Sequence, residues 1–419
     1  MIKRLKGTED ILPDVITTWR QVEEASRSIF SLYCYKEIRT PIIEESSLFM
    51  RSVGEDTDIV KKQMYLFNDQ GGHSICLRPE ETASVVRAYI ENNIDKKDGF
   101  LKLFYMGPMF RSERPQAGRL RQFHQIGVEA IGSYSPYLDA EVIMLLTRLL
   151  ESYRLKDYTV IINSLGCDTD KNNIKKRLRE ELRYSLNTLC EDCKRRYESN
   201  ILRILDCKNP FCRKALDSVS IDGILCKDCG RDFKMLQDIL DDMGVSYEVS
   251  PLLVRGLDYY TKVVFEVTAK HLGAQNAIAA GGRYDNLISD FGGQKTGACG
   301  FAIGVERVIE LLSKLDNEKL KDEKRHSVFI ATLGDEAKRQ GFRLLNELRV
   351  SGLAAEIDYQ AKSLKSQMRY ADKIKARYVI MLGENELKKG KAIVKDMTDS
   401  SQCTVALDRL VEELKSLKV

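Results

Sequence analysis

The residues from 110 to 132, FRSERPQAGRLRQFHQIGVEAIG, combine charge and spacing in a way that can do chemistry. Arginines crowd a short turn that contains proline and glycine, and the segment then alternates with a period of two, as a strand does. One face of this strand carries Phe123, Gln125, Gly127 and Glu129. A ring, an amide, a gap and a carboxylate on one face predict a pocket for a flat polar ligand, with cations beside it. An exposed basic hairpin with one buried pair is the alternative.

Three arginines from distant segments suit an anionic ligand. Arg111 lies at this turn, Arg255 lies beside a glycine before a β-rich run, and Arg307 lies in the first turn of a predicted helix. A cation in the first turn opposes the helix dipole, and a bound anion would offset that cost. Guanidinium groups match phosphate oxygens. The P-loop and the dinucleotide glycine motif are absent, so a nucleotide would lie on an antiparallel sheet. For Arg307 alone, an exposed arginine without a role is the alternative.

The elements around these residues alternate without βαβ regularity, which predicts an α+β fold with an antiparallel sheet. Apolar spacing predicts helices at 17–35 and 139–153, the second strongly amphipathic. A strand is predicted at 36–43, stopped by Pro41, and a hairpin of strands at 101–110 and 120–130 with its turn at 115–118.

Two domains are predicted. Residues 1–325 form the first and hold a charged, mostly helical, cysteine-rich insertion at about 167–250. The charged segment 316–326 is the predicted linker to a βαβαβ domain at 326–419. That second domain has a formal net charge of +4, equal to that of the whole chain. A mildly basic module fits contact with RNA, although a solvated surface would have the same charge.

The 11 cysteines are an odd number in a long chain, which favours reduced thiols or metal ligands over a disulfide framework. Cys190 and Cys193 form one C-x2-C pair and Cys226 and Cys229 another. These four thiolates could bind a structural zinc ion. Reduced thiols without metal are the alternative. No run of about 18 apolar residues and no signal-peptide core are present, so a cytoplasmic protein without a membrane span is expected.

Several separate motifs, in this order, resemble the bacterial type of the histidyl-tRNA synthetase family, which belongs to the class II aminoacyl-tRNA synthetases. They are the Pro41 segment, the stretch at 110–132, GFAIGVERVIELL at 300–312, and two histidine-specific motifs, LVRGLDYYT and AAGGRYDNL. The resemblance covers essentially the full length. It implies a class II catalytic sheet, a C-terminal anticodon-binding domain, ATP and Mg²⁺ in the reaction, tRNA and L-histidine as substrates, and a homodimer joined through the Pro41 segment.

The resemblance also implies roles for residues of this chain. Arg111 and Arg255 are expected to be catalytic, on the α-phosphate and beside the histidine. Phe123 would stack on adenine, Glu113 would meet the adenine edge, and Arg119 and Arg307 would bind the outer phosphates. The histidine pocket would be lined by Glu80, Thr82, Gln125, Glu129, Tyr259 and Tyr260. Where the family commonly has glycine between the glutamate and the threonine of this motif, the chain has Glu81.

Two other functions are compatible with parts of this pattern. A synthetase-like paralogue serves as the histidine-binding regulatory subunit of the first enzyme of histidine biosynthesis, but it typically lacks the C-terminal domain and has eroded motifs. A tRNA-binding module without catalysis is disfavoured because the phosphate-binding arginines are complete.

Overall fold

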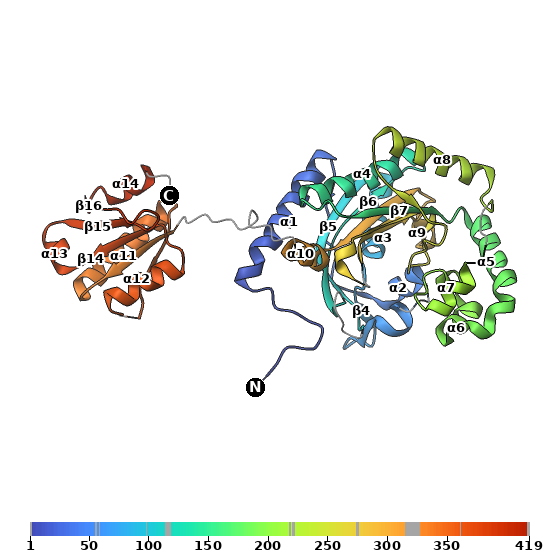
Figure 1. Cartoon of the computed structure of the whole chain (residues 1–419), viewed down its shortest axis with the longest axis horizontal. Coiled ribbons are helices and arrows are strands. Elements are labelled where there is room, and N and C mark those ends of the chain that lie inside the picture. The colour runs from blue at the N-terminus through green and yellow to red at the C-terminus, as the bar shows by residue number, and fades with distance from the viewer. Residues whose placement is uncertain are drawn as a thin grey trace. The chain divides into compact units, whose positions relative to one another are not determined.

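The structure is a computed structural model that describes residues 2–54, 57, 59–97, 99–113, 119–217, 219, 223–273, 276–314, 327–360 and 362–416. The chain divides into two compact units, Met1–Lys321 and Asp322–Val419 (Figure 1), and each is described here by itself. The predicted turn at 115–118 and the predicted linker at 316–326 lie outside the described residues.

An eight-stranded sheet forms the centre of the first unit. Its strands lie in the order β1 (Lys36–Glu37), β5 (Leu101–Phe110), β6 (Gln122–Ile131), β11 (Ala298–Gly304), β10 (Ala277–Arg283), β9 (Thr261–Thr268), β7 (Thr159–Ser164) and β8 (Glu248–Val249). The pairs β1/β5 and β7/β8 are parallel and the other neighbours are antiparallel. The predicted α+β class is therefore confirmed.

The predicted hairpin of two long strands is also confirmed. In β5 and β6, Leu101 lies opposite Ile131 and Phe110 lies opposite Gln122, without a bulge between them. The strand predicted at 36–43 is wrong. β1 ends at Glu37, and β2 (Ile43–Glu45) belongs to a separate three-stranded sheet with β4 (Ser74–Leu77) and β3 (Tyr65–Asn68). Pro41 lies between the two short strands and has no N–H to donate to a ladder.

The two faces of β6 have different neighbours. Its even-numbered residues Ile126 and Val128 are buried in a core with apolar residues of α1 (Pro13–Leu32) and α4 (Pro136–Ser152). The apolar stripe predicted for α4, which includes Leu145 and Leu149, is fully buried there. The odd-numbered residues therefore point to the opposite face of the sheet.

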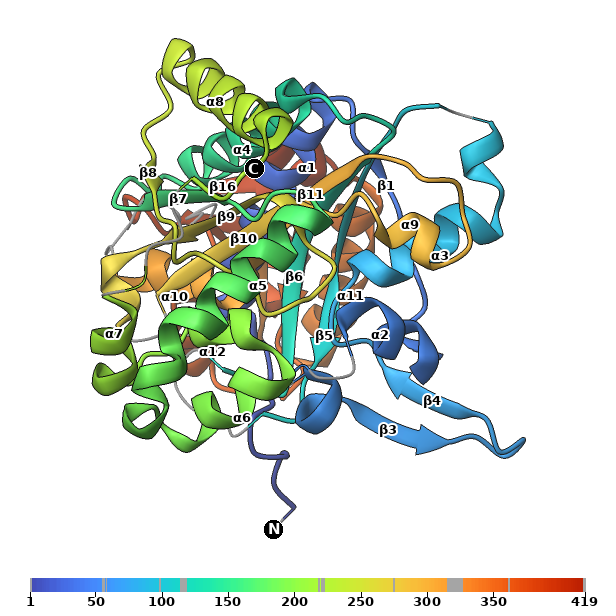
Figure 2. The same cartoon turned by 90° about the vertical axis from the view of Figure 1, so that its right-hand side faces the viewer.

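Helices α3 (Thr82–Glu91) and α9 (Leu287–Asp290) pack on that opposite face, in a second core with Tyr105 and Ile131, and α2 (Ser46–Val53) contacts both of them. Helix α10 (Val305–Lys314) belongs instead to the first core, where it lies beside α1. The insertion leaves the sheet after β7 and returns at β8. It contains α5 (Asp168–Leu182), α6 (Glu191–Ser199), α7 (Pro210–Leu216) and α8 (Lys227–Asp242). Figure 2 shows α5, α6 and α7 grouped together, with α8 separate from them and beside α4.

The second unit is a small α/β fold built on a five-stranded sheet. Its strands lie in the order β13 (Ala354–Ile357), β12 (Ser327–Thr332), β14 (Tyr378–Leu382), β15 (Lys391–Asp396) and β16 (Gln402–Ala406). Its helices are α11 (Asp335–Val350), α12 (Leu364–Lys373), α13 (Glu384–Lys388) and α14 (Leu410–Ser416). The first three strands pair in parallel, as the predicted βαβαβ pattern requires, and an antiparallel hairpin completes the sheet. Among the described residues of both units, no helix is long and apolar enough to cross a membrane.

Glu81, the departure from the family pattern, is part of a buried ion pair beneath the β4–α3 connection. Its carboxylate lies 2.8 Å from a guanidinium nitrogen of Arg78 and accepts a 2.6 Å hydrogen bond from the Thr40 hydroxyl. Both side chains of the pair are buried, and Arg78 also donates to the carbonyl oxygen of Pro108. Glu81 therefore stabilises the connection that precedes α3.

We expect Glu81→Ala to lower the free energy of unfolding by about 3 kcal/mol, because it leaves the buried Arg78 guanidinium without its counter-charge. Glu91→Ala is the matched control. It removes an exposed partner from the pair with Arg87, and we expect a loss of about 0.5 kcal/mol or less. Urea denaturation of both variants measures the difference, and equal losses would contradict the assignment.

Candidate active site

A cavity of about 710 Å³ opens on the face of the sheet that holds the odd-numbered residues of β6. Every residue predicted for the nucleotide or the amino acid lines it: Glu80, Thr82, Arg111, Glu113, Arg119, Phe123, Gln125, Glu129, Arg255, Tyr259, Tyr260 and Arg307. The structure thus brings together segments that are far apart in the sequence. The individual roles given above for these residues stay predictions.

Small residues form the floor of the cavity. Gln125 lies opposite Gly304 in the β6/β11 register, and Glu129 lies opposite Gly300. A Cβ atom on Gly300 would come within 2.0 Å of the Glu129 carboxylate, so glycine is required there. The prediction that Gly127 leaves open space for a ligand is wrong. A Cβ atom at that position would lie 2.3 Å from the hydroxyl oxygen of Tyr105, which fills the gap.

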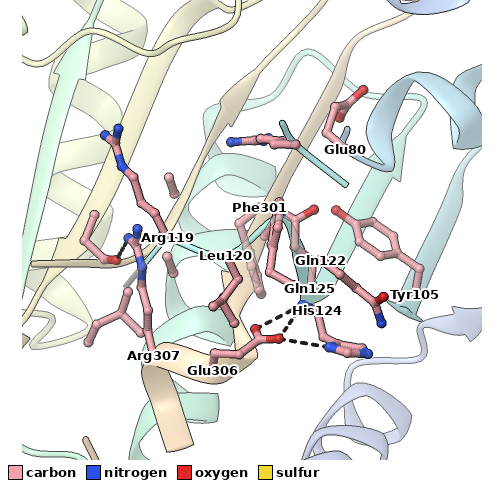
Figure 3. Close-up of a pocket in the computed structure, with 18 of the residues that line it drawn as sticks. Glu80, Tyr105, Arg119, Leu120, Gln122, His124, Gln125, Phe301, Glu306 and Arg307 are labelled. Carbon is pink, nitrogen blue, oxygen red and sulfur yellow. Dashed lines mark hydrogen bonds and ion pairs between the residues drawn. The ribbon is translucent and has the colours of Figure 1, made fainter. Parts of the chain in front are cut away.

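Guanidinium groups gather at one end of the cavity. In Figure 3, Arg119 and Arg307 lie on one side, and Glu80 and Tyr105 lie on the other. Burial lowers the pKa of Arg307, and the positive charges of Arg119 and Arg111 lower it further. Burial also lowers the pKa of Arg111, the carboxylates of Glu113 and Glu80 raise it, and the positive charge of Arg255 lowers it. Guanidinium groups that lie close together repel one another.

Backbone carbonyl groups and two carboxylates hold these cations in place. The Nε atom of Arg111 donates to the carbonyl oxygen of Pro79 at 3.0 Å, and its guanidinium lies 5.2 Å from the centre of the Phe123 ring. Arg307 donates to the carbonyl oxygen of Ala277 and Arg255 to the carboxylate of Glu266. Glu113 forms a 3.3 Å ion pair with Arg119. Positive charge exceeds negative charge at this end, so the site favours an anion.

A buried carboxylate marks the other end. Glu129 is 1% exposed and accepts hydrogen bonds from the hydroxyl groups of Thr82 at 2.7 Å and Tyr284 at 2.5 Å. Burial raises the pKa of Glu129 to about 8, although both hydrogen bonds favour the charged form. On the same strand, the Oε1 atom of Gln125 is buried without a hydrogen-bond partner among the described residues. A buried acceptor without a partner is costly unless a ligand donates to it.

The remaining predicted residues enclose this end. Glu80 precedes α3, and its two oxygens accept from the backbone N–H groups of Thr82 at 2.8 Å and Ala83 at 2.9 Å. Its carboxylate is buried, and burial raises its pKa. Tyr259 and Tyr260 pack with ring centres 4.6 Å apart, and the Tyr259 hydroxyl lies 3.5 Å from Glu80. Two carboxylates and two tyrosines thus form a small polar pocket.

Sequence reasoning missed two of the residues that shape this pocket, Tyr284 and Tyr105. Tyr284 belongs to the motif AAGGRYDNL, which predicts no role for it by itself, although it supplies one of the two hydrogen bonds to Glu129. Its position two residues after the glycine pair was the available signal. Tyr105 gave no signal, because in the sequence it is one of several aromatic residues of β5.

The prediction that Cys190, Cys193, Cys226 and Cys229 form one metal site is wrong in its grouping. Cys190 and Cys193 lie with Cys207 and Cys212, whereas Cys226 and Cys229 lie with Cys167 and Asp170. The spacing of each C-x2-C pair was informative, but the partner of each pair depends on how the insertion folds.

A mostly antiparallel sheet that carries an arginine-lined cavity on one face is typical of the class II aminoacyl-tRNA synthetases. Comparisons with known proteins identify the family within this class. The protein-family model for histidyl-tRNA synthetase matches residues 7–308, and the model for an anticodon binding domain matches residues 327–417. The chain belongs to the histidyl-tRNA synthetase family.

Individual relatives match almost the whole chain. The histidine–tRNA ligase of Thermodesulfovibrio yellowstonii is 49% identical over 412 residues, which are 98% of this chain and 97% of that protein. The histidine–tRNA ligase of Halothermothrix orenii is 49% identical and covers 99% of each chain. Among solved structures, the apo histidyl-tRNA synthetase of S. aureus is 36% identical, with a TM-score of 0.82, and covers 99% of this chain and 100% of that one.

The raised pKa of Glu129 predicts a pH dependence of stability without any ligand. The folded protein retains a proton that an unfolded carboxyl group, with a pKa of about 4.3, has already lost. Stability should therefore fall as the pH rises from about 5 to 8, by up to about 1.4 kcal/mol per pH unit from this residue. Glu129→Gln cannot titrate, so its unfolding free energy relative to the wild type should increase across that range.

Urea denaturation at several pH values between 5.5 and 7.5 measures this effect. The control is Glu151→Gln, whose side chain is 54% exposed, and its difference from the wild type should stay constant. A constant difference for Glu129→Gln as well would show that this carboxyl group titrates normally.

Proposed function

We propose that this chain is a histidine–tRNA ligase, which activates L-histidine with ATP and transfers it to the 3′ end of its tRNA. The observation that carries the proposal is the presence, in one cavity, of a group of guanidiniums at one end and a buried glutamate on a floor of glycines at the other. Full-length relatives with this activity support it.

The cationic end would bind ATP. Arg111 would contact the α-phosphate from one side and Arg255 from the other, and Arg119 and Arg307 would bind the outer phosphates. Phe123, which already lies against the Arg111 guanidinium, would stack on adenine, with Glu113 at the adenine edge. The mutual repulsion of these cations supports this assignment, because polyphosphate removes it.

The polar end would bind histidine. Glu129 has lone pairs left beyond its bonds to Thr82 and Tyr284, so it can accept an imidazole N–H. Gln125, Tyr259 and Tyr260 would surround the ring, and Glu80 and Thr82 would bind the ammonium group. An amino acid without a ring N–H would leave a buried carboxylate unpaired, and such sites discriminate strongly.

The chemistry then requires positioning rather than a covalent enzyme intermediate. A histidine carboxylate oxygen attacks the α-phosphorus, and the bond to pyrophosphate breaks. The terminal ribose hydroxyl of the tRNA next attacks the carbonyl carbon of the adenylate, and AMP leaves. Arg111 and Arg255 would stabilise the charge on the pentacoordinate phosphorus, a contribution that depends on donors fixed before the reaction.

Mg²⁺ would accompany ATP and neutralise charge on the outer phosphates. Such an ion takes most of its ligands from phosphate and water.

The remaining parts of the proposal concern partners and domains. The unit at 326–419 would bind the anticodon region of the tRNA, in keeping with its match to an anticodon binding domain. Residues 1–325 would form the catalytic domain. A homodimer formed through the Pro41 segment and a cytoplasmic location are proposed from the family resemblance.

One assay separates this function from its alternatives. Purified protein is supplied with ATP and with each amino acid in turn, with and without its tRNA. A ligase consumes ATP with histidine and forms histidyl-tRNA. A regulatory paralogue would bind histidine without charging tRNA, and an RNA-binding module would bind tRNA without consuming ATP.

We expect Arg255→Ala to reduce histidine-dependent pyrophosphate exchange by at least about 100-fold, because it removes a charged donor from the transition state. Arg255→Lys should recover little of this loss, since lysine cannot donate two parallel hydrogen bonds to phosphate. Circular dichroism and thermal unfolding verify that both variants are folded.

Arg148→Ala is the matched control, because this arginine is 62% exposed on α4 and lies outside the cavity. Its exchange rate should equal that of the wild type. Near-normal exchange by Arg255→Ala would refute the role given to this residue.

A further inference from the structure

The helical insertion contains two compact groups of metal-ligating side chains that the proposed reaction does not use. The first, called the Cys190 group, consists of Cys190, Cys193, Cys207 and Cys212. The second, called the Cys167 group, consists of Cys167, Asp170, Cys226 and Cys229. Within each group the ligand atoms all lie within 4.8 Å of one another, and none of these cysteines forms a disulfide.

The spacing of the sulfur atoms fits a tetrahedral metal site. Zinc–sulfur bonds of about 2.3 Å place two ligand sulfurs about 3.8 Å apart, whereas a disulfide needs about 2 Å. The Sγ atoms of Cys190 and Cys207 are 3.9 Å apart. Three members of the Cys190 group are buried, so solvent reaches these sulfurs poorly.

Backbone N–H groups point at the ligand atoms. In the Cys190 group, the N–H of Cys190 donates to the sulfur of Cys212 at 3.2 Å, and that of Asn209 donates to the sulfur of Cys207 at 3.5 Å. Such donors stabilise thiolates, which is the form that binds metal.

The Cys167 group is organised around a buried aspartate. Asp170 is 1% exposed, and its two carboxylate oxygens accept from the N–H groups of Cys226 at 3.0 Å and Cys167 at 3.3 Å. No cationic side chain is paired with Asp170 in any ion pair of the described residues. A buried carboxylate beside three thiols therefore has a donor set suited to a divalent metal ion.

We propose that the insertion holds two structural zinc ions, one bound by the four sulfurs of the Cys190 group and one by the three sulfurs and the carboxylate of the Cys167 group. Four protein ligands close each site, which is typical of structural rather than catalytic zinc. Each ion joins segments distant in sequence: the first joins α6 to α7, and the second joins the start of α5 to the start of α8.

The segments that the two ions would join also contact the loop that carries Arg255, Tyr259 and Tyr260. Lys171 follows the ligand Asp170, and its ammonium group donates to the carbonyl oxygens of Asp258 at 2.9 Å and Tyr260 at 2.8 Å. Asn200 follows α6, and its amide donates to both carboxylate oxygens of Asp258. The two metal sites thus fix, from two directions, the loop that encloses the polar pocket.

Metal content tests the two sites directly. Full-length protein purified without chelator should contain two zinc ions per chain by inductively coupled plasma mass spectrometry. Cys193→Ser and Cys229→Ser should each retain one, and the double variant none. Cys34→Ser and Cys403→Ser are the matched controls, because both thiols are exposed and lie outside the insertion, and each should retain two.

Cobalt substitution tests the sites in the wild-type protein, so its result does not depend on whether a variant folds. Wild-type protein loaded with Co²⁺ should show thiolate-to-cobalt charge-transfer bands and the strong visible bands of tetrahedral coordination, at two equivalents. Less than 0.2 zinc per chain together with no cobalt spectrum would overturn the proposal. One ion that is lost in both single variants would overturn the assignment of two separate sites.

The effect on the pocket rests on the proposed function and is tested separately. After zinc is removed with a chelator, we expect the KM for histidine to rise about tenfold, because the loop contributes both tyrosines to the histidine pocket. Added Zn²⁺ should restore the original value. An unchanged KM for histidine in folded, zinc-free protein would refute the link to the loop, and zinc stoichiometry would stand even if the protein activated no amino acid.

Discussion

Repulsion between like charges is the constraint on which the architecture of the cavity depends. Several guanidinium groups share one cavity before any ligand is present, and Arg307 is affected by the charges of both Arg111 and Arg119. Backbone carbonyl oxygens of Pro79 and Ala277 each occupy one N–H of a guanidinium fork. Carbonyl groups partly offset the positive charge without cancelling it. The rigid sheet thus stores an electrostatic cost that an anionic substrate relieves.

The opposite problem is solved at the other end of β6. There a carboxylate is buried, and hydroxyl groups rather than cations are its partners. Hydroxyl donors lower the cost of burial but leave the pKa of Glu129 well above its ordinary value. An arginine partner would have lowered that pKa and taken up the lone pairs that a ligand needs. Because its partners are neutral, Glu129 can still accept a hydrogen bond from a substrate. β6 contributes one residue to each end, Phe123 beside Arg111 and Glu129 in the polar pocket, because alternate residues of a strand lie on the same face.

How much could be predicted from the sequence follows from the range of the interactions involved. The β5/β6 hairpin and the buried stripe of α4 depend on local periodicity, and both were predicted with nearly correct bounds. The gathering of the arginines and the glutamates in one cavity was predicted from motifs rather than from physics, since sequence periodicity carries no information about contacts between distant segments. Tyr284 was missed because its partner Glu129 is 155 positions away. The cysteines were grouped wrongly because each C-x2-C pair supplies half of a site and cannot show which other segment completes it.

The position of the insertion in the topology explains why its rigidity matters to the pocket. The chain leaves the sheet after β7 and returns at β8, which pairs in parallel with β7 through Ile161 and Glu248. Residues 250–260 then follow directly and lead into β9. The pocket tyrosines are thus the last residues before a sheet strand and lie beside helices that the sheet itself does not hold. The start of this loop is held by the sheet, because the side chain of Asn163 in β7 donates to the carbonyl oxygens of Pro251 and Leu253. Its end is fixed by β9, and between these points the insertion adds the hydrogen bonds of Lys171 and Asn200 to the loop. The two proposed zinc ions would therefore stiffen the segments that hold the middle of the loop.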